Sequence, residues 1–173
     1  MKPLNINFKI TSVFEAHDEI NDGWPTRIIT LLGGADAHFM PHLGDHHLIQ
    51  LFDDVEGEDV FGWALPTVEM VQNVLNWTAD LTEDDRLLIH CRAGKSRSTA
   101  MMIGILMQHG SGPLDALDSV LARRRIAIPN RLMIKQIDGI MKMQGVLIDV
   151  VNRFYTRNKG AGFLLPNRGG NNL

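Results

Sequence analysis

The stretch that carries the most information about the fold is residues 87–99, which read LLIHCRAGKSRST. Its apolar beginning is typical of a short strand that is buried on both faces of a sheet. The five residues after Cys91 predict a tight loop, and the apolar run over residues 98–108 predicts a buried helix. The stretch therefore predicts a strand, a loop and a helix in direct succession.

Such a strand–loop–helix turn is suited to binding an anion, because loop N–H groups point inward and the helix N-terminus adds partial positive charge. Gly94 allows a tight bend, and Arg97 returns one turn later with a planar guanidinium group that holds two phosphate oxygens. The pKa of a free thiol is about 8.5, but at a helix N-terminus beside cations it falls to ~3.5–7.5. The residues therefore predict a phosphate-binding loop with Cys91 as its thiolate nucleophile.

The letters HC, five further residues and RS, at positions 90–98, resemble the signature of the cysteine-dependent protein tyrosine phosphatase superfamily. The letters RSTA at positions 97–100 resemble its dual-specificity branch, and the likeness extends over roughly residues 27–137. The resemblance implies an α/β fold in which a central, mostly parallel sheet of about four to five strands is flanked by helices. It also implies a helical C-terminal half.

The resemblance further implies a role for each residue of the site. Cys91 is the nucleophile that forms a phosphocysteine, and Arg97 binds the phosphate and the transition state. Ser98 hydrogen-bonds the departing sulfur, His90 helps to set its pKa, and Asn130, after a proline, steadies the loop from outside. The other phosphate-binding residues, whose amides line the cradle, are Arg92, Ala93, Gly94, Lys95 and Ser96. The resemblance implies no metal and no other cofactor.

The dual-specificity branch also uses an aspartate on a loop after an earlier strand as general acid, a role worth roughly 10²–10⁴ in rate. Asp53 and Asp54 follow the predicted third strand. Asp54 is the favoured acid because apolar Val55 follows it, and Asp53 is the next candidate. Asp59 is the third, since it lies at the more usual sequence distance from the cysteine.

The remaining sequence predicts strands interleaved with helices. We expect one catalytic domain over residues 1–165 and a flexible tail over residues 166–173. Strands are predicted at residues 8–13, 27–32, 47–52 and 86–90, and further helices at residues 66–81, 113–125, 130–141 and 146–155.

Composition limits the classes of function. Of 173 residues, 45% are hydrophobic and 21% charged, and the net charge is −3, so nothing global favours nucleic acid or a stable membrane association. The single cysteine excludes an internal disulfide and predicts a cytoplasmic setting. The expected partner is a phosphorylated protein or a small phosphoester.

Several rival interpretations are weaker. A nucleotide-binding loop ending at Gly94-Lys95-Ser96 needs a glycine where Ile89 stands. A sulfurtransferase of the rhodanese type also places a cysteine in an anion-binding loop, but the loop is typically shorter. A histidine repeat is interrupted by proline and glycine, which predicts a solvated loop; it consists of His38, His42 and His46. A run of three arginines predicts a solvated helix end or a basic rim; it consists of Arg123, Arg124 and Arg125.

The sequence therefore predicts a phosphatase for phosphotyrosine, with phosphoserine and phosphothreonine as further substrates. One alternative is a phosphoinositide or inositol phosphate phosphatase, because Arg92 and Lys95 make the loop strongly basic. Another is a pseudophosphatase, a module that binds phosphorylated partners with little turnover.

Overall fold

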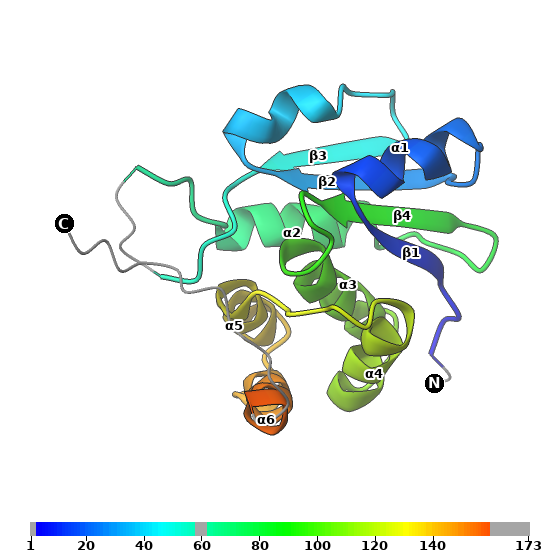
Figure 1. The fold of residues 1–173 in the computed structure, drawn as a ribbon. Coiled ribbons are helices and arrows are strands. Elements are labelled where there is room, and N and C mark those ends of the chain that lie inside the picture. Colours follow the sequence, from blue (N-terminus) through cyan, green and yellow to red (C-terminus); the bar gives the residue numbers. More distant parts are fainter. Residues whose placement is uncertain (1–2, 58–61, 160–173) are drawn as a thin grey trace.

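The computed structural model describes residues 3–57 and 62–159 (Figure 1). In chain order, the elements are β1 (Asn7–Ser12), α1 (Val13–Asn21), β2 (Arg27–Leu32), the 3-10 helix η1 (Gly34–Phe39), β3 (His47–Leu51), α2 (Val68–Trp77), β4 (Arg86–Cys91), α3 (Arg97–Gln108), α4 (Pro113–Arg123), α5 (Arg131–Ile140) and α6 (Val146–Lys159).

The four strands form one parallel sheet in the order β1-β4-β2-β3. Helices α1 and η1 cover one face of the sheet, and α2 to α6 cover the other (Figure 1). The predicted α/β class, the parallel central sheet and the helical second half are thus confirmed. Since the carboxyl ends of parallel strands share one edge of the sheet, the loops after β1, β2, β3 and β4 meet there.

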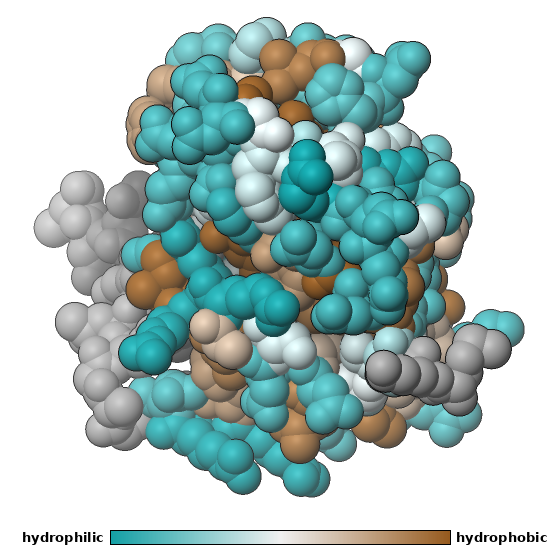
Figure 2. Space-filling model, turned by 90° about the vertical axis from the view of Figure 1, so that its right-hand side faces the viewer, coloured by the Kyte–Doolittle hydropathy of each residue, from teal (hydrophilic) through white to brown (hydrophobic). Residues whose placement is uncertain are grey.

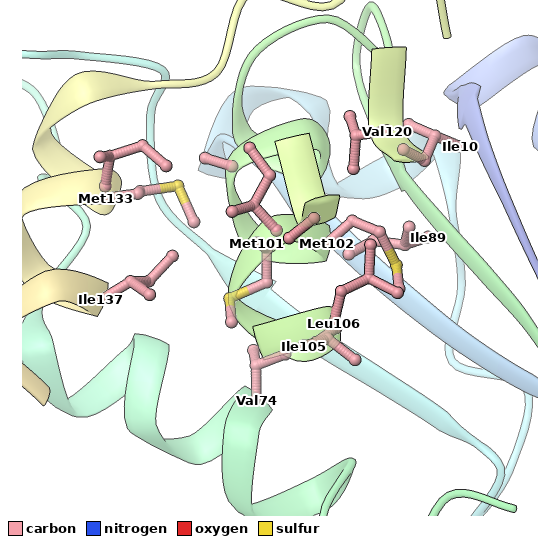
Figure 3. Close-up of a cluster of buried hydrophobic side chains, with 14 of the residues drawn as sticks. Ile10, Val74, Ile89, Met101, Met102, Ile105, Leu106, Val120, Met133 and Ile137 are labelled. Carbon is pink, nitrogen blue, oxygen red and sulfur yellow. The ribbon is translucent and has the colours of Figure 1, made fainter. Parts of the chain in front are cut away.

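Helix α3 lies at the centre of the larger core, which explains why its sequence is apolar on all sides (Figure 3). It packs against β1 and β4 and also against α2, α4 and α5. Met101, Met102 and Ile105 have no exposed surface. This packing fixes the N-terminus of α3 against the end of β4, which is where the predicted phosphate-binding loop begins.

Successive side chains of β4 point to opposite faces of the sheet. Ile89 and Cys91 belong to the larger core around α3, whereas Leu88 belongs to the smaller core under α1 and η1. His90, two residues after Leu88, is therefore on the α1 face, next to the cysteine in sequence but on the other side of the sheet.

The structure corrects several predicted boundaries. The first strand ends at Ser12, because the capping box of Ser12 and Glu15 starts α1, a helix that the sequence analysis missed. Helix α2 begins at Val68, after the Thr67 cap, rather than at a proline. It ends at Trp77 rather than at residue 81, because the next residue bonds back to the helix carbonyls.

Some predictions concern residues outside those that the structure describes. The proposed tail, residues 166–173, lies outside the described residues, and the single domain over residues 1–165 stays a prediction. Among the residues that the structure does describe, no helix has the length and apolar character to cross a bilayer.

Candidate active site

The loop between β4 and α3 has all five of its carbonyls, from Arg92 to Ser96, hydrogen-bonded to donors outside the cradle. A carbonyl and the next residue's N–H share one planar trans peptide and point in opposite directions. The N–H groups of residues 93–97 therefore face inward, as an anion nest requires. The carbonyl of Arg92 accepts from the N–H of Val13 (3.2 Å), and the carbonyls of Ala93 and Gly94 accept from the side chain of Arg124 (3.3 and 3.0 Å). The carbonyl of Lys95 accepts from the N–H of Ile128 (2.6 Å) and from the hydroxyl of Thr99 (2.7 Å). The carbonyl of Ser96 accepts from the N–H of Asn130 (3.2 Å).

Gly94 is required by the close approach of the loop to β1. Its φ of +64° lies in the left-handed region, and a Cβ atom there would be 2.5 Å from the carbonyl group of Thr11. No other residue type fits both conditions, so the loop depends on this glycine.

Cys91 is buried at the C-terminal end of β4, with its Sγ 3.3 Å from the Oγ of Ser98. Burial by itself raises the pKa of the thiol, but the charge of Arg97 and hydrogen bonds from the hydroxyl and backbone of Ser98 lower it. The net shift of the pKa is downward, which favours the thiolate.

Arg97, 4% exposed, is held at the first turn of α3. Its Nη1 donates to the carbonyl of Phe52 at 2.6 Å, which fixes the guanidinium group beside the end of β3. Its Nε–H is buried and has no hydrogen-bond partner within the described residues. An unpaired buried donor is costly, so this geometry favours an anion next to the guanidinium group.

Asp54 lies against the phosphate loop. Its Oδ1 accepts hydrogen bonds from the Oγ of Ser96 (2.6 Å) and from the Nδ2 of Asn130 (3.0 Å). Asn130 also donates to the carbonyl of Val55 at 3.1 Å, and its Oδ1 caps α5. The charge of Asp54 is close enough to raise the pKa of Cys91 in part. Asn130 therefore connects the segment after β3, the phosphate loop and the start of α5.

The side chain of Asp53 contacts Ala64 and Gly33 rather than the phosphate loop. Its backbone N–H and its Oδ2 bond to the carbonyl and N–H of Ala64, at 2.7 and 2.9 Å, which closes the base of the segment between β3 and α2. Its Oδ1 occupies the space where a side chain on Gly33 would stand, 2.3 Å from an ideal Cβ. Asp59, the third candidate acid, lies outside the described residues.

His90 belongs to a buried chain of three side chains on the α1 face of the sheet. The Oγ1 of Thr30 lies 2.7 Å from the Nε2 of His90 and 2.7 Å from the Nε2 of His47. All three residues are at most 3% exposed. Burial lowers the pKa of His90 to about 3 and that of His47 to about 4, and each pKa is lowered further by neighbouring histidines.

One backbone amide fixes the tautomer of His47. The N–H of Leu43 donates to the Nδ1 of His47 at 3.2 Å, so the proton of this neutral ring is on Nε2. That Nε2–H donates to the hydroxyl of Thr30. The Nδ1 of His90 is buried and has no hydrogen-bond partner among the described residues.

The buried histidines predict that stability falls in acid. Their pKa values lie below the unfolded value of 6.5, so between pH 6.5 and about 4 the unfolded chain binds more protons than the folded one. We expect the free energy of unfolding to fall from pH 7 to pH 5, by up to about 1.4 kcal/mol per pH unit for each histidine. Urea titrations of the wild type, His47→Gln and the exposed control His38→Gln measure this. Only His47→Gln reduces the slope; an unchanged slope contradicts the assignment.

Arg92 is tied to η1 and not directed at the cradle. It pairs with Asp36 and lies over the ring of Phe39, with 5.7 Å between the guanidinium carbon and the ring centroid. Phe39 in turn meets Phe14 edge to face at 5.9 Å, and Phe14 is 63% exposed at the start of α1. An aromatic wall of Phe14 and Phe39 therefore adjoins the loop. The exposed Lys95 has no side-chain hydrogen bond or ion pair in the part of the chain described.

The histidine repeat is exposed at all three positions, with His38 on η1 and His42 stacked on His47 at 5.6 Å. The prediction of a solvated loop therefore missed the 3-10 helix over residues 34–39. Across residues 3–57 and 62–159, no group of three or more His, Cys, Asp or Glu side chains is placed to hold a metal ion.

The structure adds residues to the site that sequence reasoning missed. Thr30 and His47 support His90 from neighbouring strands, and Glu15 and Arg124 lie behind the loop. One signal was available: Ser12 followed three residues later by Glu15 is a capping-box pattern, which predicts a helix directly after β1. The prediction that Arg124 is a solvated helix end or a rim residue is wrong, because its side chain bonds the loop carbonyls.

Comparisons with known proteins were made by sequence and by structure. No family model matches the chain. It is 27% identical over 112 residues to "Protein phosphatase Slingshot homolog 2" of Homo sapiens. The matched region covers 64% of this chain and 7% of that protein. The chain is 38% identical over 61 residues to "Dual specificity protein phosphatase 1" of Arabidopsis thaliana, covering 35% of this chain and 31% of that protein. The chain thus spans less than a third of either relative.

Solved structures share the fold. Human DUSP28 superposes with a TM-score of 0.59 at 19% identity, over 78% of this chain and 88% of that one. PTPMT1 in complex with PI(5)P superposes with a TM-score of 0.56 at 14% identity, over 87% and 94% of the two chains. The chain is thus similar in sequence to two protein phosphatases, one of them a dual-specificity phosphatase, and it shares its fold with solved structures that include DUSP28 and PTPMT1.

Proposed function

We propose that this protein is a cysteine-dependent phosphatase that hydrolyses phosphate monoesters, phosphotyrosine among them, through a phosphocysteine intermediate. One observation carries the proposal: a buried cysteine with a lowered pKa ends β4 at a loop whose carbonyls are all bonded outward. The buried Nε–H of Arg97, which has no partner among the described residues, supports it, because a bound phosphoryl oxygen would satisfy that donor.

In the first step the Cys91 thiolate attacks phosphorus and the bond to the leaving oxygen breaks. Asp54 gives its proton to that oxygen, while Arg97 and the inward amides stabilise the charge on the equatorial oxygens. In the second step water attacks the phosphocysteine and gives a proton to the Asp54 carboxylate. The sulfur–phosphorus bond breaks, inorganic phosphate forms, and the Ser98 hydroxyl hydrogen-bonds the restored thiolate.

The test is turnover of a simple aryl phosphate together with binding of vanadate, each measured on the wild type. Release of phosphate supports the proposal. Vanadate binding without release would identify a phospho-binding module instead, and the absence of both would contradict the phosphate-site assignment.

The aromatic wall predicts a preference for aryl substrates. Phe14 is 63% exposed and, with Phe39, stands beside Arg92, the first residue of the loop. Aromatic pairs contribute about 0.5–1.5 kcal/mol beyond area burial, so we expect Phe14→Ala to lower kcat/KM for a phosphotyrosyl peptide about 2- to 10-fold. We expect kcat/KM for the matching phosphoseryl peptide to change less than twofold.

The exposed Leu114 provides the matched control, because Leu114→Ala removes a similar apolar surface at the start of α4, the end of that helix opposite Arg124 and the loop. If Phe14→Ala lowered kcat/KM equally for the phosphotyrosyl and phosphoseryl peptides, the aromatic wall would have no role in substrate recognition.

A phosphoinositide or inositol phosphate is the second candidate substrate. The exposed side chain of Lys95, which has no partner among the described residues, favours it, since a second phosphate group could pair with that cation. PTPMT1, which shares the fold, was solved with PI(5)P bound. The two candidate substrate classes are separated by measuring activity on a panel of phosphotyrosyl and phosphoseryl peptides, inositol phosphates and phosphoinositides. If a polyphosphorylated compound is the substrate, Lys95→Met lowers activity on the polyphosphorylated members of this panel alone.

A further inference from the structure

Arg124 follows α4 directly and reaches the outer side of the phosphate loop. Its Nε donates to the carbonyl of Gly94 at 3.0 Å, and its Nη2 donates to the carbonyl of Ala93 at 3.3 Å. The side chain is 15% exposed. It therefore holds two consecutive carbonyls at the point where the loop backbone takes its left-handed turn.

These two contacts act on the inside of the loop. The carbonyl of Ala93 shares a peptide plane with the N–H of Gly94, and the carbonyl of Gly94 shares one with the N–H of Lys95. Holding both carbonyls outward directs both N–H groups inward. The other three loop carbonyls have backbone N–H donors, so among the described residues Arg124 is the side chain on which these two amides depend.

Glu15 orients the guanidinium group. Its two carboxylate oxygens accept from Nη1 and Nη2 of Arg124 at 3.0 and 2.8 Å, a bidentate pair. The same carboxylate accepts the N–H of Ser12 at 2.6 Å, and Ser12 is the register partner of Cys91 in the sheet. Glu15 thus ties Arg124 to the end of β1, directly beside the nucleophile.

This pair stays charged under ordinary assay conditions. The hydrogen bond from Arg124 lowers the pKa of Glu15 to about 2 against the opposing effect of burial, and bonds from Ser12 add to it. The pair lines a groove of about 430 Å³ along the edge of β1, between α1 and α4. Figure 2 views the molecule from the side of β1 and shows mostly hydrophilic side chains with hydrophobic surface between them.

We propose that Arg124, oriented by Glu15, is a positioning residue that turns the N–H groups of Gly94 and Lys95 toward the phosphoryl group bound at Cys91. The inference rests on the proposed phosphatase function. Neither residue touches the substrate. Their effect is to fix two of the five inward amides before the substrate arrives, so that the cradle needs little reorganisation in the transition state.

The test compares Arg124→Lys with Arg123→Lys. Lysine keeps the charge but cannot donate to two carbonyls and a carboxylate in fixed directions. Arg123 is the matched control, because it lies over the ring of Phe8 and makes no hydrogen bond with the loop. We expect Arg124→Lys to weaken vanadate binding and lower kcat/KM on an aryl phosphate by about 10- to 100-fold, the scale of one or two charged hydrogen bonds. Arg123→Lys should change neither by more than about twofold.

A second readout separates positioning from general destabilisation. The pH dependence of Cys91 alkylation by iodoacetate should show a higher thiol pKa in Arg124→Lys than in Arg123→Lys, because misdirected amides stabilise the thiolate less. Glu15→Gln, at a half-exposed position, should shift vanadate affinity in the same direction, and its effect should not add to that of Arg124→Lys.

Three outcomes overturn the inference: vanadate affinity in Arg124→Lys equal to that in Arg123→Lys, an unchanged thiol pKa, or full additivity with Glu15→Gln. If Arg124→Lys does not fold, Glu15→Gln alone decides, and unchanged vanadate affinity there overturns the proposal. If the wild-type protein binds no vanadate, the phosphatase assignment itself is contradicted. This result differs from failure of the positioning role, in which the wild type binds vanadate and Arg124→Lys binds it equally well.

Discussion

Replacing Cys91 with serine is expected to reduce turnover of an aryl phosphate by roughly 10⁴- to 10⁶-fold, the scale seen when a covalent nucleophile is removed. The change replaces one atom, and a serine hydroxyl at this site stays protonated where the thiol ionises. The inward amides and Arg97 are unchanged, so the variant should still bind a phosphotyrosyl peptide. Single-turnover kinetics measure the first effect, and titration calorimetry measures the second.

The pair of measurements makes this prediction decisive. Activity in Cys91→Ser equal to that of the wild type would show that the buried thiol is not the nucleophile. Loss of peptide binding along with activity would show that the serine variant no longer forms the cradle. Trapping of the peptide without turnover is the expected result.

The second large effect is expected at Asp54. Asp54→Asn should lower kcat on phenyl phosphate, which has a poor leaving group, by about 10²- to 10⁴-fold. On p-nitrophenyl phosphate the loss should be much smaller, because a good leaving group departs without a proton. The Asn variant keeps an oxygen that accepts from Ser96 and Asn130, so the loop contacts survive the change. The limb of the pH profile that reports the protonated acid should also disappear.

Asp53→Asn is the matched control for this prediction. The two carboxylates are adjacent in sequence, but that of Asp53 bonds to the N–H of Ala64 and packs over Gly33, and only that of Asp54 contacts the phosphate loop. Asp53→Asn should therefore affect both aryl phosphates equally and modestly. A leaving-group dependence in Asp53→Asn and none in Asp54→Asn would reverse the assignment.

The central part of this protein could be predicted from one contiguous segment. The strand, the loop and helix α3 follow one another without interruption, so the distance between Cys91 and Arg97 along the chain also sets their distance in space. The pattern of strands interleaved with helices indicated the α/β class, and the resemblance to the phosphatase superfamily implied the mostly parallel sheet. Helix α1 was missed, because its short amphipathic pattern follows a strand with no break.

The sequence alone determined which residues form the phosphate loop and which chemical groups it offers. Tertiary structure decided what surrounds it: which of two neighbouring aspartates faces the loop, how Thr30 and His47 reach His90, and how Arg124 meets Glu15 across 109 positions of sequence. The physical reason is the register of the parallel strands. A shift of one residue in β2 or β3 would turn Thr30 or His47 to the opposite face of the sheet, and the spacing of residues within a single segment carries no information about that register.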